Sequence, residues 1–123
     1  MDFDAHRGEH RLFLIFAASR RDEGFARQDR LLEGAGDGFE ERDLLRADLL
    51  EDGAGSFGGA RVSSGEVAEA RGWFGVGPGR FAALLVGKDG TVKYRSDKPV
   101  GPGGIFALVD AMPMRRREMR EGG

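Results

Sequence analysis

Residues 81–97 read FAALLVGKDGTVKYRSD, and this stretch decides the fold. The six apolar residues 81–86 are too few for a typical helix and are typical of a strand buried on both faces. Asp89-Gly90 then supplies the positive-φ positions of a tight turn. Residues 91–95 alternate in polarity, which predicts a second strand. The stretch therefore predicts a β-hairpin with a central first strand and a second strand nearer an edge of the sheet.

The second strand of this hairpin carries a basic pattern. Alternation places Val92 and Tyr94 on one side and Thr91, Lys93 and Arg95 on the other. A candidate anion-binding surface is therefore expected on and around the hairpin, made of Arg80, Lys88, Lys93, Arg95, Lys98 and Arg115. The free N–H groups of a helix that begins at Gly101-Pro102-Gly103 would add to it. The alternative is a solvated edge strand whose charges prevent aggregation.

The composition is that of one globular domain. The chain has 123 residues, 40% of them hydrophobic and 33% charged, which is enough for a single core. No apolar run approaches the ~20 residues of a membrane span. The first residues lack a basic region followed by an apolar one, so no signal peptide is predicted. A cytoplasmic location is expected, or a periplasmic or secreted one if a leader has been removed.

The chain contains no cysteine, which excludes disulfides, thiol catalysis and cysteine-ligated metals. The net charge is −2, with an acidic excess in residues 1–60 and a basic excess in residues 61–123. This division is too weak to predict binding to nucleic acid. It favours an encounter between the second half of the chain and an anionic partner.

The rest of the chain predicts further strands and helices around the hairpin. Apolar patterns and capping residues place strands over 11–17 and 43–51, and helices over about 19–33, 63–74 and 102–112. Residues 43–51 also fit a helix, and a strand is favoured because a crossover helix precedes them. Residues 52–60 contain four glycines and predict a mobile loop.

This order of elements is βαβαββα, the layout of the thioredoxin fold. Right-handed crossovers then predict an α/β fold, a four-stranded mixed sheet with helices on both faces. Residues 1–10 are expected to be a flexible N-terminus, residues 11–112 the thioredoxin-like domain, and residues 113–123 a basic C-terminal tail.

Several stretches resemble one known family. They are RLFLIF (11–16), Arg27-Gln28, Glu41-Arg42-Asp43, residues 81–100 and IFALVDAMPMRRREMR (105–120). In them the chain is similar to the DUF4174 family, a thioredoxin-like domain of unknown function. The resemblance implies a relation to domains of animal extracellular-matrix proteins of the sushi-repeat and equarin group. It also implies a likeness to peroxiredoxins in the hairpin, and hence the idea of redox activity.

The chain departs from the redox members of this fold where their chemistry takes place. These proteins keep a nucleophilic thiolate where the first strand meets the first helix. Here that corner reads Ala-Ala-Ser-Arg-Arg over residues 17–21. The hydroxyl of Ser19 cannot exchange with disulfides, because the reactive species is a low-pKa thiolate. A thiol-dependent oxidoreductase is therefore excluded.

Ser19, Gln28 and Arg42 are the residues that a non-thiol enzyme would place near this corner. Ser19 is more readily a helix cap, and Arg42 is expected to pair with a carboxylate or to be a surface charge. His6 and His10 fit a polar N-terminal segment better than a metal site. The glycines 75, 77 and 79 predict a turn and lack the spacing of a dinucleotide-binding loop. No metal and no cofactor is predicted.

These observations predict a redox-inactive thioredoxin-like domain that acts as a binding or interaction module. The partner would be an anionic ligand, a glycan or a protein. Two alternatives remain open. One is an enzyme with non-thiol chemistry at the strand–helix corner. The other is a structural or self-assembling module, a homo-oligomer, in which Met112, Met114 and Met119 make the contacts.

Overall fold

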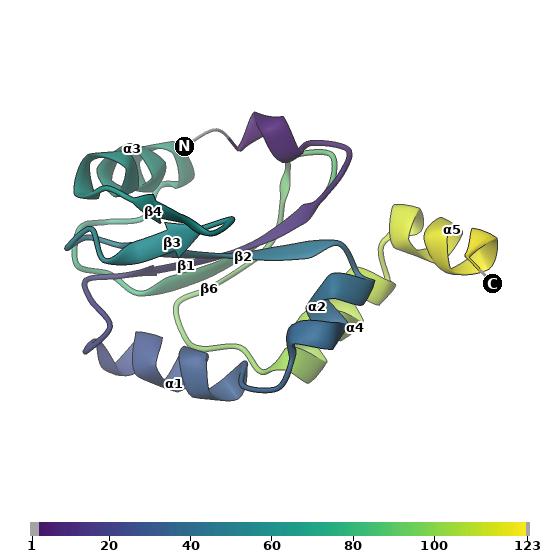
Figure 1. Cartoon of the computed structure of the whole chain (residues 1–123), viewed down its shortest axis with the longest axis horizontal. Helices are drawn as coiled ribbons and strands as arrows, with labels where there is room; N and C mark the ends of the chain where they lie inside the picture. Colours follow the sequence, from purple (N-terminus) through teal and green to yellow (C-terminus); the bar gives the residue numbers. More distant parts are fainter. Residues whose placement is uncertain (1–2, 123) are drawn as a thin grey trace.

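The computed structural model describes residues 3–122, which form a central sheet with helices on both faces (Figure 1). In chain order the elements are η1 (Asp4–His6), β1 (Arg11–Ala17), α1 (Glu23–Leu31), α2 (Gly36–Glu41), β2 (Leu44–Leu50), β3 (Gly55–Phe57), β4 (Ala60–Val62), α3 (Ser64–Phe74), β5 (Ala82–Val86), β6 (Val92–Ser96), α4 (Pro102–Asp110) and α5 (Pro113–Glu121). None of the helices within residues 3–122 is long and apolar enough to cross a membrane.

The sheet is mixed, as predicted, and its strand order is β4-β3-β2-β1-β5-β6. The pair β1–β2 is parallel, and the other neighbouring strands are antiparallel. The sheet has six strands rather than four, because residues 52–62 hold the short hairpin β3–β4 where a mobile loop was expected. Residues 43–51, whose sequence also fits a helix, contain the strand β2, as favoured.

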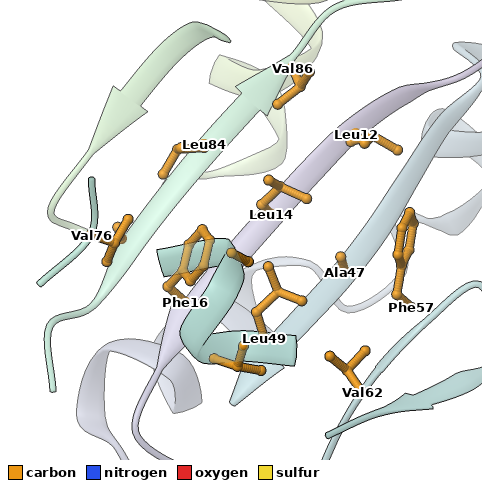
Figure 2. Close-up of a cluster of buried hydrophobic side chains, with 13 residues drawn as sticks. Leu12, Leu14, Phe16, Ala47, Leu49, Phe57, Val62, Val76, Leu84 and Val86 are labelled. Atoms are coloured by element: carbon orange, nitrogen blue, oxygen red, sulfur yellow. The ribbon is translucent and has the colours of Figure 1, made fainter. Parts of the chain in front are cut away.

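Each face of the sheet has its own core, because successive side chains of a strand point to opposite faces. Leu12, Leu14 and Phe16 of β1 pack towards α3, with Leu84 of β5 beside them (Figure 2). Phe13 and Ile15 belong to the second core, on the face that α1, α2 and α4 cover (Figure 1). All seven residues of β1 are buried, so β1 is the central strand of both cores.

The predicted hairpin is confirmed as β5 and β6, but its face assignment is wrong. Leu85 pairs with Tyr94 whereas Val86 pairs with Val92, so Lys93 is an extra residue on β6. This β-bulge interrupts the alternation. Val92 therefore lies on the α3 side, opposite Val86, and Tyr94 lies on the other side, opposite Leu85.

The helices also depart in part from the prediction. The first helix begins after Asp22, whose carboxylate accepts the N–H of Phe25, so Ser19 is not its cap. The helix α2 replaces the loop expected after residue 34. The helix predicted over residues 63–74 is confirmed as α3, with Ser63 and Glu66 forming a capping box. Residues 113–121 of the expected tail form α5, which follows α4 and lies at the C-terminal end of the chain (Figure 1).

Candidate functional site

A cavity of about 470 Å³ lies between the hairpin turn and the junction of α4 with α5. We call it the turn–helix cavity. On one side its lining is apolar and comes from the end of α4 and the start of α5, and on the other side it is charged. The lining residues are Arg11, Gly87, Lys88, Asp89, Lys93, Leu108, Ala111, Met112, Pro113 and Met114.

Two cations of this cavity are buried. Arg11, the first residue of β1, is 1% exposed, and Lys88, in the hairpin turn, is 8% exposed. The register of the sheet explains their proximity, because β5 runs antiparallel to β1 and ends at Val86 beside Leu12. Buried charges destabilise a fold unless they are paired and hydrogen-bonded. Arg11 and Lys88 therefore require carboxylate partners.

The main partner is Glu118 of α5. Nη1 and Nη2 of Arg11 donate to its two carboxylate oxygens at 3.2 and 3.1 Å, and Nζ of Lys88 donates to Oε2 at 2.7 Å. Burial alone would raise the pKa of Glu118. The hydrogen bonds from Arg11 and Lys88 outweigh burial, so the pKa of Glu118 lies below its ordinary value. The carboxylate is therefore held ionised between two buried cations.

Asp43 is the second carboxylate partner of Lys88. Its Oδ2 accepts from Nζ of Lys88 at 2.9 Å, and its backbone carbonyl accepts the N–H of Arg11 at 2.7 Å. Asp43 has φ +50°, in the left-handed region, which aspartate tolerates better than most residues. Because Asp43 directly precedes β2, this one residue ties the start of both parallel strands to the hairpin turn.

A second group of ion pairs adjoins the first. Arg42 donates through Nε and Nη2 to both carboxylate oxygens of Asp110, each at 3.0 Å, and its guanidinium lies 4.2 Å from the ring centre of Phe106. Nε of Arg115 donates to the same carboxylate at 3.2 Å. These hydrogen bonds, from Arg42 first and Arg115 second, lower the pKa of Asp110. The expected pairing of Arg42 with a carboxylate is confirmed. Arg42, at the end of α2, is tied to α4, and Arg115 ties α5 to α4.

The predicted basic surface is divided by the fold. Lys88 and Arg115 are buried in the ion-pair groups. Lys93 borders the turn–helix cavity and pairs with Asp89 at 2.8 Å; this hydrogen bond, followed by those from Thr91, lowers the pKa of Asp89.

The other three predicted cations lie elsewhere. Arg95 donates to the carbonyl oxygens of Phe74 and Gly75 at the end of α3, at 2.5 and 2.7 Å. Arg80 and Arg95 border a separate cavity of about 260 Å³, and Arg80 and Lys98 are exposed. The structure therefore brings Lys88 and Lys93 together, and it sets the pair Arg80 and Arg95 apart from them.

The three corner candidates do not gather at one place. Ser19 accepts the N–H of Arg21 at 3.1 Å. Gln28 is fully buried, and its side-chain amide exchanges two hydrogen bonds of 2.8 Å with the backbone of Val100. Arg42 precedes β2 and Ser19 follows β1, and these strands are parallel, with Arg11 beside Leu44. Arg42 and Ser19 therefore lie at opposite ends of the sheet.

Arg11 and Glu118, which form the central ion pair of the site, are not among the sequence candidates. The available signal for Arg11 was a charged residue at the start of a strand that is otherwise apolar. Glu118 lies within residues 105–120, which with residues 81–100 are among the stretches that resemble the family. These stretches and Arg42-Asp43 meet at the turn–helix cavity and its ion pairs.

Comparisons with known proteins show the fold and the family. The solved structures that resemble this chain include thioredoxin peroxidase I of Plasmodium yoelii, with a TM-score of 0.63 and 16% identity over 100% of this chain and 82% of that one. Another is Plasmodium yoelii Prx1a modified at the N-terminus, described as an artifactual octamer, with a TM-score of 0.59 and 17% identity over 98% and 81% of the two chains. At these identities the likeness shows the fold alone, which is thioredoxin-like, as predicted.

A curated relative is Coiled-coil domain-containing protein 80 of Danio rerio, 41% identical over 59 residues. The match covers 47% of this chain and 7% of the relative, so the chain corresponds to a small part of that protein. The family model described as "Domain of unknown function (DUF4174)" matches residues 2–118. The chain therefore belongs to the DUF4174 family.

Proposed function

We propose that this domain is a redox-inactive binding module and that it binds a small amphipathic anion in the turn–helix cavity. The observation that carries the proposal is the lining of this cavity, with the apolar Leu108, Met112 and Pro113 facing a side that contains Lys88 and Lys93. Its volume of about 470 Å³ lies within the range of small-molecule sites, roughly 300–1,000 Å³. A ligand with an apolar body and one anionic group matches both sides.

The charged side of the cavity retains hydrogen-bonding capacity. An ammonium group has three donors, and the described partners of Lys88 are Asp43 and Glu118. Nε of Arg11 is buried and has no partner among the described residues. The pair of Lys93 with Asp89 is solvent-exposed, 36% and 50% respectively. Such pairs contribute little stability, so only a small free energy is lost when Lys93 leaves Asp89 to bind a ligand.

The thiol chemistry of the structurally similar peroxidases is not expected of this chain. Thiol peroxidase activity needs a thiolate, and the chain contains no cysteine. At the strand–helix corner, a Cβ added to Gly24 would lie 2.8 Å from the ring of Phe81. The first turn of α1 therefore packs directly on that aromatic ring. We accordingly assign ligand binding to the opposite end of β1.

Backbone-amide NMR with octanoate as the probe tests the proposal. We expect saturable shifts in residues 87–93 and 111–114, and weaker shifts with octan-1-ol, which has the same chain without the charge. Lys93→Ala should weaken octanoate binding about three- to tenfold, because it removes one exposed cation. Lys98→Ala, an exposed lysine outside the cavity lining, is the matched control. Absence of saturable shifts around the cavity, or equal binding of the alcohol, would contradict the proposal.

Self-association is a second candidate function, favoured by the exposed apolar side chains of α5. Met114 and Met119 are 42% and 40% exposed. We expect that, if α5 mediates a dimer, the double variant Met114→Gln/Met119→Gln lowers the sedimentation coefficient of the protein. An unchanged coefficient would remove this candidate. The relation of the domain to sushi-repeat and equarin-type matrix proteins stays a prediction.

A further inference from the structure

We infer that Arg11 and Lys88 form a carboxylate-binding subsite of the turn–helix cavity and that Glu118 is its internal occupant, which a ligand carboxylate displaces. This inference rests on the proposed function and specifies both the anionic group of the ligand and the residue with which it competes. Because its internal occupant, Glu118, is a residue of α5, this helix regulates access to the subsite.

The first support is the unequal supply of carboxylates to the two cations. Lys88 receives one from Asp43 and one from Glu118. For Arg11, the carboxylate supplied by residues 3–122 is Glu118, 107 positions away along the chain. A guanidinium that is 1% exposed thus depends for its charge partner on a separate helix. A planar carboxylate from another source would satisfy the same two donors.

The second support is the position of the subsite. Arg11 and Lys88 both line the cavity that the apolar part of the ligand would occupy. The side chain of Glu118 is 28% exposed, so it has a path to solvent that does not cross the core. A ligand in the cavity therefore lies beside the two cations, and the group that it must replace can leave towards water.

The third support is the way in which α5 is attached. Its described polar contacts with the rest of the domain come from Arg115 and Glu118. Arg115 lies 4.0 Å from Glu118, but its hydrogen bonds go to Asp110 and Glu41 and do not involve the subsite. Release of Glu118 therefore leaves the start of α5, and with it the wall of the cavity at Pro113 and Met114, in place.

The test compares Glu118→Gln with Glu121→Gln, which alters an exposed carboxylate of the same helix. Isothermal titration with octanoate should show about tenfold tighter binding to Glu118→Gln than to the wild type, because the ligand no longer has to displace a charged carboxylate from Arg11 and Lys88. Binding of octan-1-ol should not change in either variant, and Glu121→Gln should behave as the wild type. Glu118→Asp, whose shorter side chain retains the charge, serves as a second variant if Glu118→Gln does not fold.

A second readout comes from the wild type. Octanoate should shift the amides of residues 116–121 as Glu118 is displaced, and octan-1-ol should not. Saturable octanoate binding at the cavity with equal or weaker affinity in Glu118→Gln would overturn this inference and leave the proposed function intact. Failure of octanoate to bind the wild type and Glu118→Gln would overturn both.

Discussion

Replacing Arg11 by methionine tests how far the ion pairs of the turn–helix cavity stabilise the fold. Methionine keeps much of the apolar length of the side chain and removes the guanidinium. Three described hydrogen bonds are lost, two to the carboxylate of Glu118 and one of 2.9 Å to the backbone carbonyl of Arg42. The variant leaves Glu118 with two described cationic partners, Lys88 at 2.7 Å and, at the longer distance of 4.0 Å, Arg115.

The expected loss follows from these contacts. Removing one partner of a buried ion pair costs about 3–5 kcal/mol. Glu118 is 28% exposed, so water partly solvates the abandoned carboxylate, and the added apolar burial of methionine offsets part of the loss. We therefore expect Arg11→Met to lower the free energy of unfolding by about 2–3 kcal/mol.

Urea unfolding followed by circular dichroism measures this change. Arg116→Met, an exposed arginine of α5, is the matched control and should shift the free energy by less than about 0.5 kcal/mol. In a double-mutant cycle with Glu118→Gln the two effects should be non-additive by at least about 1 kcal/mol. Additive effects, or a loss for Arg11→Met no larger than that of the control, would refute the reasoning.

Three further predictions concern stability. Gln28→Leu should cost about 2–4 kcal/mol in urea unfolding, because the backbone N–H and C=O of Val100 lose their buried partners; a loss within experimental error would show that Gln28 is not a structural tie. Since Asp110 and Glu118 have lowered pKa values, their contribution to stability is present above the pKa values of the unfolded chain and lost as the pH falls through those of the fold. Urea midpoints between pH 6 and 3 should therefore fall less steeply in Asp110→Asn than in the wild type, and an identical slope would contradict this. Gly55→Ala should destabilise the protein by about 1–3 kcal/mol in thermal unfolding, because its Cβ would lie 2.0 Å from a backbone oxygen of β2; an unchanged melting temperature would show that β3 does not approach β2 so closely.

The parts of the fold that the sequence predicts well have local signals. An apolar run and an Asp-Gly turn predict the hairpin, and the capping box of Ser63 and Glu66 predicts α3. The helix α2 has six residues and no side-chain cap, so no capping signal marks its start. The strands β3 and β4 have three residues each, which is too short for alternation to be recognised.

The site was harder to predict than the fold because its residues meet through tertiary structure. Arg11 and Glu118 are separated by 107 positions, and no periodic pattern relates them. The bulge at Lys93 depends on how β6 pairs with β5, which residues 91–95 alone do not reveal. Lys88 is among the cations that the sequence suggests, but its burial depends on a partner on α5. The sequence therefore identifies the charged residues but does not show which of them the fold brings together.

The location of the turn–helix cavity at the N-terminal end of β1 separates it from the strand–helix corner. The strand has seven residues and therefore spans about 23 Å, well beyond the roughly 8 Å over which physiological salt screens solvent-exposed charges. A change of charge at the strand–helix corner, for example at the exposed Arg20, is therefore screened from the exposed Lys93 at the rim of the cavity. The two ends of the sheet can therefore be altered separately, and substitutions at the corner leave the charges of the proposed binding site in place.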